Sequence, residues 1–170
     1  MKRETPQGVK PETPSKSREP QESMALPERP DAPSPESVRR ARTHWQLAGE
    51  SLRQAQKEHQ ARHFIQGGFL SLQAAQNALN TLCQLQGHIL PPLHSPSALS
   101  TLVTADIPAL EGLIAPCHAL EAVQGLNPFA GQRDDETEQA QSKQALDHAQ
   151  AVLTQVRAYL KAHRKRFFAP

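Results

Sequence analysis

Between residues 38 and 55 the apolar positions recur at alternating spacings of three and four residues. This spacing places the apolar side chains on one face of an α-helix, whereas a half-buried strand would alternate at every second position. The positions are Val38, Ala41, Trp45, Ala48, Leu52 and Ala55. The preceding Ser34-Pro35-Glu36 combines a preferred N-cap, a proline suited to the first helical position and an acid in the first turn. A first long helix is therefore predicted from about residue 35.

A second helix is predicted from near Gly67-Gly68 to Gly87, a residue type typical of the position after a helix C-terminus. Its apolar face is expected to contain Ile65, Phe69, Leu72, Gln76, Leu79 and Cys83, widened by Ala75, Ala78 and Leu82. Pro91-Pro92 forces an extended connection. Ser95-Pro96 repeats the Ser-Pro start and predicts a short helix that carries Leu99, Leu102 and Val103.

A third long helix is predicted after residue 106, with Asp106 or Thr104 as its cap. Pro116 lies inside its pattern and is expected to kink the helix near the middle. The side chains expected to face inward are Ile107, Leu110, Leu113, Ile114, Cys117 and Leu120.

The last helix is predicted to begin at the acids of Asp134-Asp135-Glu136, after the break at Gly125-Leu126-Asn127-Pro128. Its apolar stripe contains Leu146, Ala149, Leu153, Val156, Leu160, His163 and Phe167. Four long helices separated by short breaks favour an antiparallel bundle over one long coiled coil. The predicted fold is all-α, an antiparallel four-helix bundle with a short extra helix between helices 2 and 3.

The first 36 residues have a different composition from the rest of the chain. They contain 8 of the 15 prolines, and their only large aliphatic residues are Val9, Met24 and Leu26. Such a segment cannot bury enough apolar surface to offset an ordering entropy of about 1–2 kcal/mol per residue. We predict a disordered proline-rich tail at residues 1–36 and one bundle domain at residues 37–167.

The remaining composition excludes some classes of protein and leaves others open. A net charge of +2 is too small to indicate nucleic-acid binding by itself. No apolar run is long enough to span a membrane and no hydrophobic stretch follows the N-terminal charges, so a cytoplasmic protein without a membrane span is expected. Cys83 and Cys117 lie in apolar helical patterns, which favours buried free thiols over a disulfide.

Residues 73–80, Gln-Ala-Ala-Gln-Asn-Ala-Leu-Asn, resemble the Q-A-A-E-K-A-L-K signature in the second helix of HEPN domains. These are small helical bundles of higher eukaryotes and prokaryotes that are associated with nucleotide binding. The following Pro-Pro-Leu-His of residues 91–94 is similar to the family's proline and histidine before a leucine-bearing short helix. In the last helix, Ala145, Ala149, Val152 and Val156 resemble the A-x-x-x-A-x-x-V/L pattern with which the family ends. The resemblance covers about residues 38–162, but Gln76-Asn77 and Asn80 replace residues that are often charged in the family.

The resemblance implies a non-enzymatic module, without a cofactor, that binds a nucleotide, an RNA-related ligand or a partner protein. Such modules are often homodimers, and a nucleotidyltransferase would be a separate partner chain. His94 is a candidate ligand-binding residue, although it could instead cap the helix that begins at Ser95. Arg133 is the only match to the family's R-Y-P-like element and is a second ligand-binding candidate.

Catalytic members of the family resemble metal-independent endoribonuclease toxins with an Arg-x(4–6)-His motif at the start of the last helix. Histidine could act there as a general acid or base, and arginine could stabilise charge on the phosphate. No histidine follows Arg133 at that spacing, and the pattern occurs elsewhere, at Arg39/His44, Arg53/His59 and Arg157/His163. Arg157 and His163 are the weak catalytic candidates, and the non-enzymatic interpretation is favoured.

Lys161, Arg164, Lys165 and Arg166 form a basic C-terminal end beside Phe167-Phe168. These cations could complement the helix dipole, contact RNA phosphates or bind an acidic partner. A generic helical adaptor is therefore a further alternative. His59 and His63 have a spacing that suits a metal, but no third ligand lies nearby in sequence and no metal site is predicted.

Overall fold

The computed structural model describes residues 33–89, 94–124 and 135–169. Within these ranges every regular element is a helix, which confirms the all-α prediction. The α-helices are α1 (Pro35–Gln60), α2 (Phe64–Leu85), α3 (Pro96–Asp106), α4 (Ile114–Gln124) and α5 (Asp135–His163), and a 3₁₀ helix, η1 (Pro108–Leu113), precedes α4.

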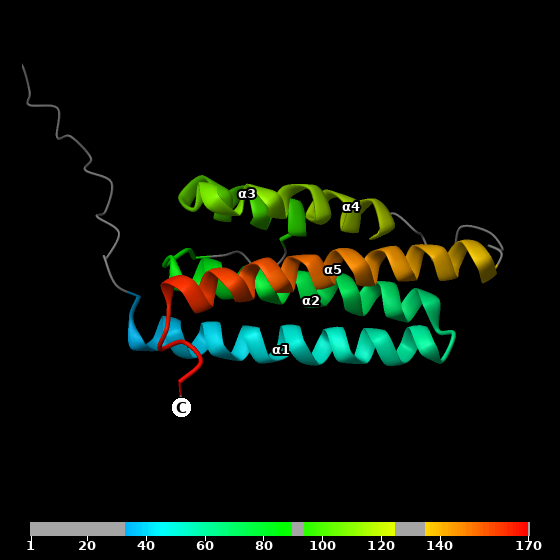
Figure 1. The fold of residues 1–170 in the computed structure, drawn as a ribbon, viewed down its shortest axis with the longest axis horizontal. Coiled ribbons are helices and arrows are strands. Elements are labelled where there is room, and N and C mark those ends of the chain that lie inside the picture. Colours follow the sequence, from blue (N-terminus) through cyan, green and yellow to red (C-terminus); the bar gives the residue numbers. More distant parts are fainter. Residues whose placement is uncertain (1–32, 90–93, 125–134, 170) are drawn as a thin grey trace, which may run out of the picture.

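Helix α2 lies at the centre of the molecule. It contacts α1 on one side, α3 and α4 on the other, and α5 along its length. Figure 1 shows that α1 and α2 run in opposite directions, whereas α5 runs in the same direction as α2. As a result, the start of α1 and the end of α5 lie at the same end of the molecule.

Small side chains allow the central helices to approach closely. On α1, Ala41, Ala48 and Ala55 are fully buried at seven-residue spacing, and on α2 three further alanines, Ala74, Ala75 and Ala78, are fully buried. The approach is tightest at Gly67, where an added Cβ would lie 2.8 Å from Ser142 Oγ of α5 and 3.3 Å from the carbonyl oxygen of Ala55. Larger residues fill the remaining interior: Leu72, Leu79, Leu82, Leu99, Val103, Leu113, Leu120, Val152, Val156 and Leu160.

The helix ends agree with the predicted signals. Ser34 caps α1 by accepting a hydrogen bond at its Oγ from the Ser37 backbone N–H at 3.1 Å. Ser95 caps α3 in the same way, with the Ala98 N–H at 3.3 Å. Gly87 follows α2 with a φ of +74°, a conformation that a residue with a side chain rarely adopts.

The prediction of a third long helix kinked at Pro116 is wrong. The chain forms α3 as far as Asp106, then the 3₁₀ helix η1, and only then α4 from Ile114. Pro116 therefore lies in the first turn of α4, where a missing N–H removes no intrahelical hydrogen bond. Asp106 and Thr104 lie in the last turn of α3 and do not cap a following helix.

Two of the predicted apolar stripes include residues that are not buried. Ile65 and Phe69, in the first two turns of α2, are 54 % and 58 % exposed. His163 was predicted at a core position of the last helix, but it is exposed. The helix ends at this residue, and Phe167, four positions later, is buried because the chain turns back.

Cys83 and Cys117 are buried free thiols, as predicted. Burial raises the pKa of each thiol to about 12. None of the helices within the described ranges is long and apolar enough to cross a bilayer. The predicted tail falls almost entirely at residues 1–32, outside the described residues, as do Pro91-Pro92 and Arg133.

The close approach at Gly67 predicts opposite effects for two glycine substitutions. Gly67→Ala should lower the free energy of unfolding by about 1–3 kcal/mol, because the new methyl group must displace Ser142 and backbone atoms. Gly49→Ala is the matched control, since a Cβ at Gly49 meets nothing within 4 Å. That variant should gain up to about 1 kcal/mol from helix propensity. Urea denaturation measures both changes, and equal stabilisation of the two variants would contradict this packing.

Candidate functional site

The C-terminal segment folds back onto the first helix. After α5 ends at His163, a turn of residues 164–169 is closed by hydrogen bonds from Phe167 N–H to the Arg164 carbonyl and from Ala169 N–H to the Arg166 carbonyl. Arg42 of α1 donates from Nε to the Phe167 carbonyl and from Nη2 to the Arg166 carbonyl, each at 3.0 Å. These two charge-assisted bonds attach the C-terminal turn to α1.

Aromatic contacts hold the same turn. Phe167 packs against the core and is 6 % exposed, whereas the neighbouring Phe168 is 42 % exposed. The Phe168 ring makes edge contacts with Trp45 of α1 at 5.9 Å and with Phe167 at 5.1 Å between ring centroids. The Phe168 ring is therefore held in position while much of it faces solvent.

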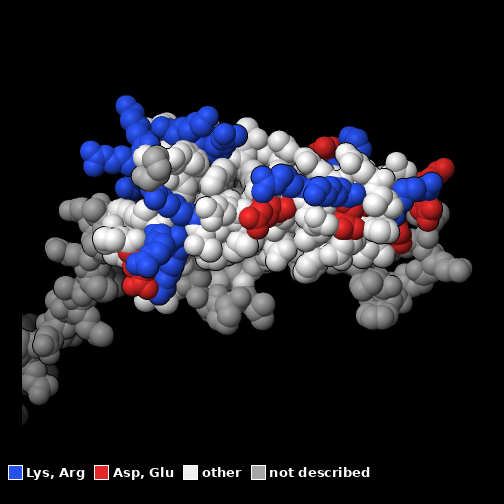
Figure 2. Space-filling view, turned by 90° about the horizontal axis from the view of Figure 1, so that it is seen from below, with Lys and Arg blue, Asp and Glu red and all other residues white. Residues whose placement is uncertain are grey.

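The turn brings cations from the C-terminal part of the chain close to cations of the first helix. Lys161, Lys165 and Arg166 are exposed and Arg164 is partly exposed. They share this end of the molecule with three arginines near the start of α1: Arg39, Arg40 and Arg42. Figure 2 shows Lys and Arg atoms gathered at the left end, whereas basic and acidic atoms are mixed along the rest of this face. We call these seven residues the basic end.

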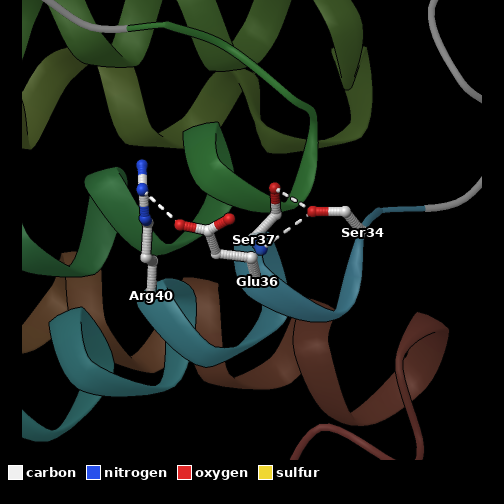
Figure 3. Close-up of polar contacts among 4 residues, drawn as sticks. All are labelled: Ser34, Glu36, Ser37 and Arg40. Atoms are coloured by element: carbon white, nitrogen blue, oxygen red, sulfur yellow. Dashed lines mark hydrogen bonds and ion pairs between the residues drawn. The ribbon is translucent and has the colours of Figure 1, made fainter.

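One acidic residue pairs with a member of the basic end. Glu36 accepts a hydrogen bond from Arg40, one turn along α1, next to the Ser34 cap (Figure 3). Both side chains of this ion pair are 63 % exposed. An exposed pair contributes only about 0–1 kcal/mol, so an anionic ligand can compete for Arg40.

A groove of about 490 Å³ lies beside the turn. Val38 of α1, Leu85 of α2 and Phe167 supply apolar lining, and Pro33 and Ala162 extend it. The cationic lining comes from Arg42 and from residues 164–166, and His163 completes it. The groove thus combines an apolar surface with the three cations of residues 164–166 as potential donors to an anion.

His94, the other ligand-binding candidate among the described residues, lies apart from the basic end. Ser95, not His94, caps α3, so the capping alternative for the His94 side chain is wrong. The His94 carbonyl accepts a hydrogen bond from Gln76 Nε2 at 2.9 Å, while the His94 Nε2 is buried and has no hydrogen-bond partner among the residues that the structure describes. The residue precedes α3, which lies on the opposite side of α2 from α1.

The catalytic candidates Arg157 and His163 are both exposed on α5. Six residues along an α-helix separate two side chains by about 9 Å along the axis and by about 120° around it. The His163 ring instead lies beside Tyr159, with 4.6 Å between ring centroids. Of the other histidines in the motif matches, His44 pairs with Asn77 and His59 with Ser142, at 3.1 and 2.9 Å.

His63, whose spacing from His59 would suit a metal, is hydrogen-bonded to a carboxylate instead. Its Nδ1 lies 2.8 Å from Glu58 Oε2, and this hydrogen bond lowers the pKa of the Glu58 carboxyl. Among the residues that the structure describes, no three His, Cys, Asp or Glu side chains lie close enough to hold a metal ion.

Sequence reasoning assigned the C-terminal cations but not the three arginines of α1. Their only sequence signal was the run of Arg39, Arg40 and Arg42 at the start of a helix, where cations oppose the dipole. Such a run at an unfavourable helix end could have been taken as a functional cluster.

Comparison with protein-family models, with curated proteins and with solved structures finds no match for this chain.

The attachment of the turn through Arg42 predicts a large difference between arginine and lysine at this position. Arg42→Lys keeps the charge but cannot form the planar two-nitrogen contact, so the turn should detach and stability should fall by about 1–3 kcal/mol. Hydrogen–deuterium exchange of residues 164–169 should become faster. Arg53→Lys, on an exposed position of the same helix, is the matched control and should leave exchange unchanged. Unaltered exchange in Arg42→Lys would rule out this attachment.

Proposed function

We propose that this protein is a non-enzymatic helical module that binds RNA through its basic end. The observation that carries the proposal is the gathering of seven cations from α1 and the C-terminal turn at one end of a molecule whose net charge is only +2. RNA carries one negative charge per nucleotide, and its neutralisation releases counterions, which favours binding to clustered Lys and Arg side chains. Exposed aromatic and arginine side chains add contacts to bases.

The arrangement of the helices supports an antiparallel four-helix bundle as the scaffold of this module. In Figure 1 the direction of the chain reverses from α1 to α2, again after α3 where η1 and α4 run back, and again to α5. In this proposal η1 and α4 together occupy the place of the third helix, and α3 is the short extra helix between helices 2 and 3.

The resemblance of residues 73–80 to the HEPN signature supports RNA as the ligand and a nucleotidyltransferase or other separate protein as a partner. The endoribonuclease alternative has less support, because Arg157 and His163 are separated around α5 and the His163 ring lies beside Tyr159. A generic adaptor for acidic proteins would use the same cations.

Removing charge from the basic end should weaken RNA binding. Replacement of Lys161, Arg164, Lys165 and Arg166 by glutamine should reduce affinity for RNA at least tenfold at low salt. It should also reduce the slope of log K against log salt concentration by up to about 3, because each phosphate contact to a single strand contributes about 0.7. Fluorescence anisotropy with a labelled RNA oligonucleotide measures both quantities.

The matched control for this experiment removes four cations elsewhere, with glutamine at Arg53, Lys57, Arg62 and Lys143. Equal losses in the two variants would show that only net charge matters and would refute a localised site. RNA cleavage by the parent, lost in both Arg157→Ala and His163→Ala, would instead establish the ribonuclease alternative.

The proposal includes a homodimer, supported by the exposed apolar side chains Ile65 and Phe69 on adjacent turns of α2. Light scattering should give twice the 18.7 kDa chain mass. Phe69→Lys should give the monomer mass, because a charge would be buried at the interface. Gln73→Lys, one turn further on at an exposed position, is the control. A parent that is monomeric at high concentration contradicts this part of the proposal.

A further inference from the structure

The exposed Phe168 ring is unusual because its position is fixed. A large aromatic side chain in a terminal segment normally reduces its exposure by packing or remains mobile. Here Trp45 and Phe167 hold the ring through T-shaped contacts, and Arg42 holds the backbone immediately before it. A large part of the ring stays open to solvent, next to Lys165 and Arg166 in the chain.

A fixed aromatic ring beside cations suits an unpaired nucleotide. Every base has a π-face that stacks on an aromatic side chain, while the adjacent phosphate pairs with Lys or Arg. In a duplex the bases are stacked on each other and the major groove of RNA is too narrow for side chains. Phe168 can therefore contribute to binding only where bases are unpaired.

The groove leads to the same conclusion. Its volume of about 490 Å³ is within the range of small-ligand sites, which are typically 300–1,000 Å³. Leu85, Val38 and Phe167 provide the apolar surface that a base requires, and Arg164 and Lys165 lie at the same groove for its phosphate. A base within a duplex cannot enter such a groove, whereas a base splayed out from a single strand can.

We infer that the basic end binds unpaired nucleotides in preference to duplex RNA, with bases against the Phe168 ring and in the adjacent groove and phosphates on the surrounding cations. This inference rests on the RNA binding proposed above and specifies the form of RNA. An acidic peptide would match the charges but would leave the Phe168 ring and the apolar groove lining without a planar partner.

The test compares three probes with the full chain by fluorescence anisotropy: a 12-nucleotide oligouridine, a 12-base-pair RNA duplex and a poly-glutamate chain. The duplex carries twice the charge of the single strand, so electrostatics alone favour it. We expect the single strand to bind at least tenfold more tightly than the duplex and the poly-glutamate. Phe168→Ala should weaken single-strand binding about tenfold and leave duplex binding unchanged. Phe168→Tyr, which keeps the ring, should restore it.

Leu47→Ala is the matched control, because Leu47 lies on α1 with the same 42 % exposure as Phe168. This variant should bind all three probes like the parent, and circular dichroism should show equal helix content throughout. Ala162→Leu fills the groove without a change of charge and should also weaken single-strand binding.

The outcomes separate the inference from the function on which it rests. Equal or tighter duplex binding, or single-strand binding that is insensitive to Phe168→Ala and Ala162→Leu, would overturn the inference while RNA binding stands. Poly-glutamate binding as tight as that of the oligouridine would also overturn it in favour of an acidic protein partner. Failure of both RNA probes to bind would overturn the inference and the proposed function together.

Discussion

The close contact of α1, α2 and α5 determines the arrangement of the rest of the protein. Alanine occupies three of the four buried positions of α1, and Gly67 leaves space for Ser142 of α5. Since these side chains are small, the helix backbones approach closely and the helix ends are placed with little freedom. This packing positions the end of α5 beside the start of α1, and a chain that leaves α5 must cross α1 immediately. The Arg42 contacts to the C-terminal turn become possible only because of this arrangement.

Much of the fold could be predicted because its signals are local. The Ser-Pro starts at residues 34–35 and 95–96, Gly87 after α2 and the alanine and leucine stripes all depend on neighbouring residues, and the structure agrees with them. Predictions failed where a signal had two local meanings. Proline kinks a helix in its interior but fits its first turn, and Pro116 belongs to the second case because η1 ends just before α4. The stripe of α2 continues through Ile65 and Phe69, but periodicity does not show whether a neighbouring helix covers that turn.

Only the C-terminal half of the candidate site could be predicted from the sequence, because its two groups of cations are far apart in the chain. Lys161 and Arg164 to Arg166 are adjacent in the chain and formed an obvious cluster, whereas the arginines at residues 39–42 lie more than a hundred positions away. Only the antiparallel course of α1 and α5 joins the two groups. The overall charge of +2 conceals this arrangement, since acids and bases are mixed over the rest of the face in Figure 2. The proposed RNA binding depends on where these charges are gathered and on the Phe168 ring held by Trp45 and Phe167.

Nuclear magnetic resonance tests most directly whether that end of the molecule is where RNA binds. In a ¹⁵N-labelled sample titrated with a short single-stranded RNA, the amide signals of residues 33–45 and 161–169 should shift in a concentration-dependent way. The amides near the opposite end, around residues 58–66 and 135–143, should remain unchanged. Shifts confined to that opposite end, or spread evenly over all helices, would contradict a site built from α1 and the C-terminal turn.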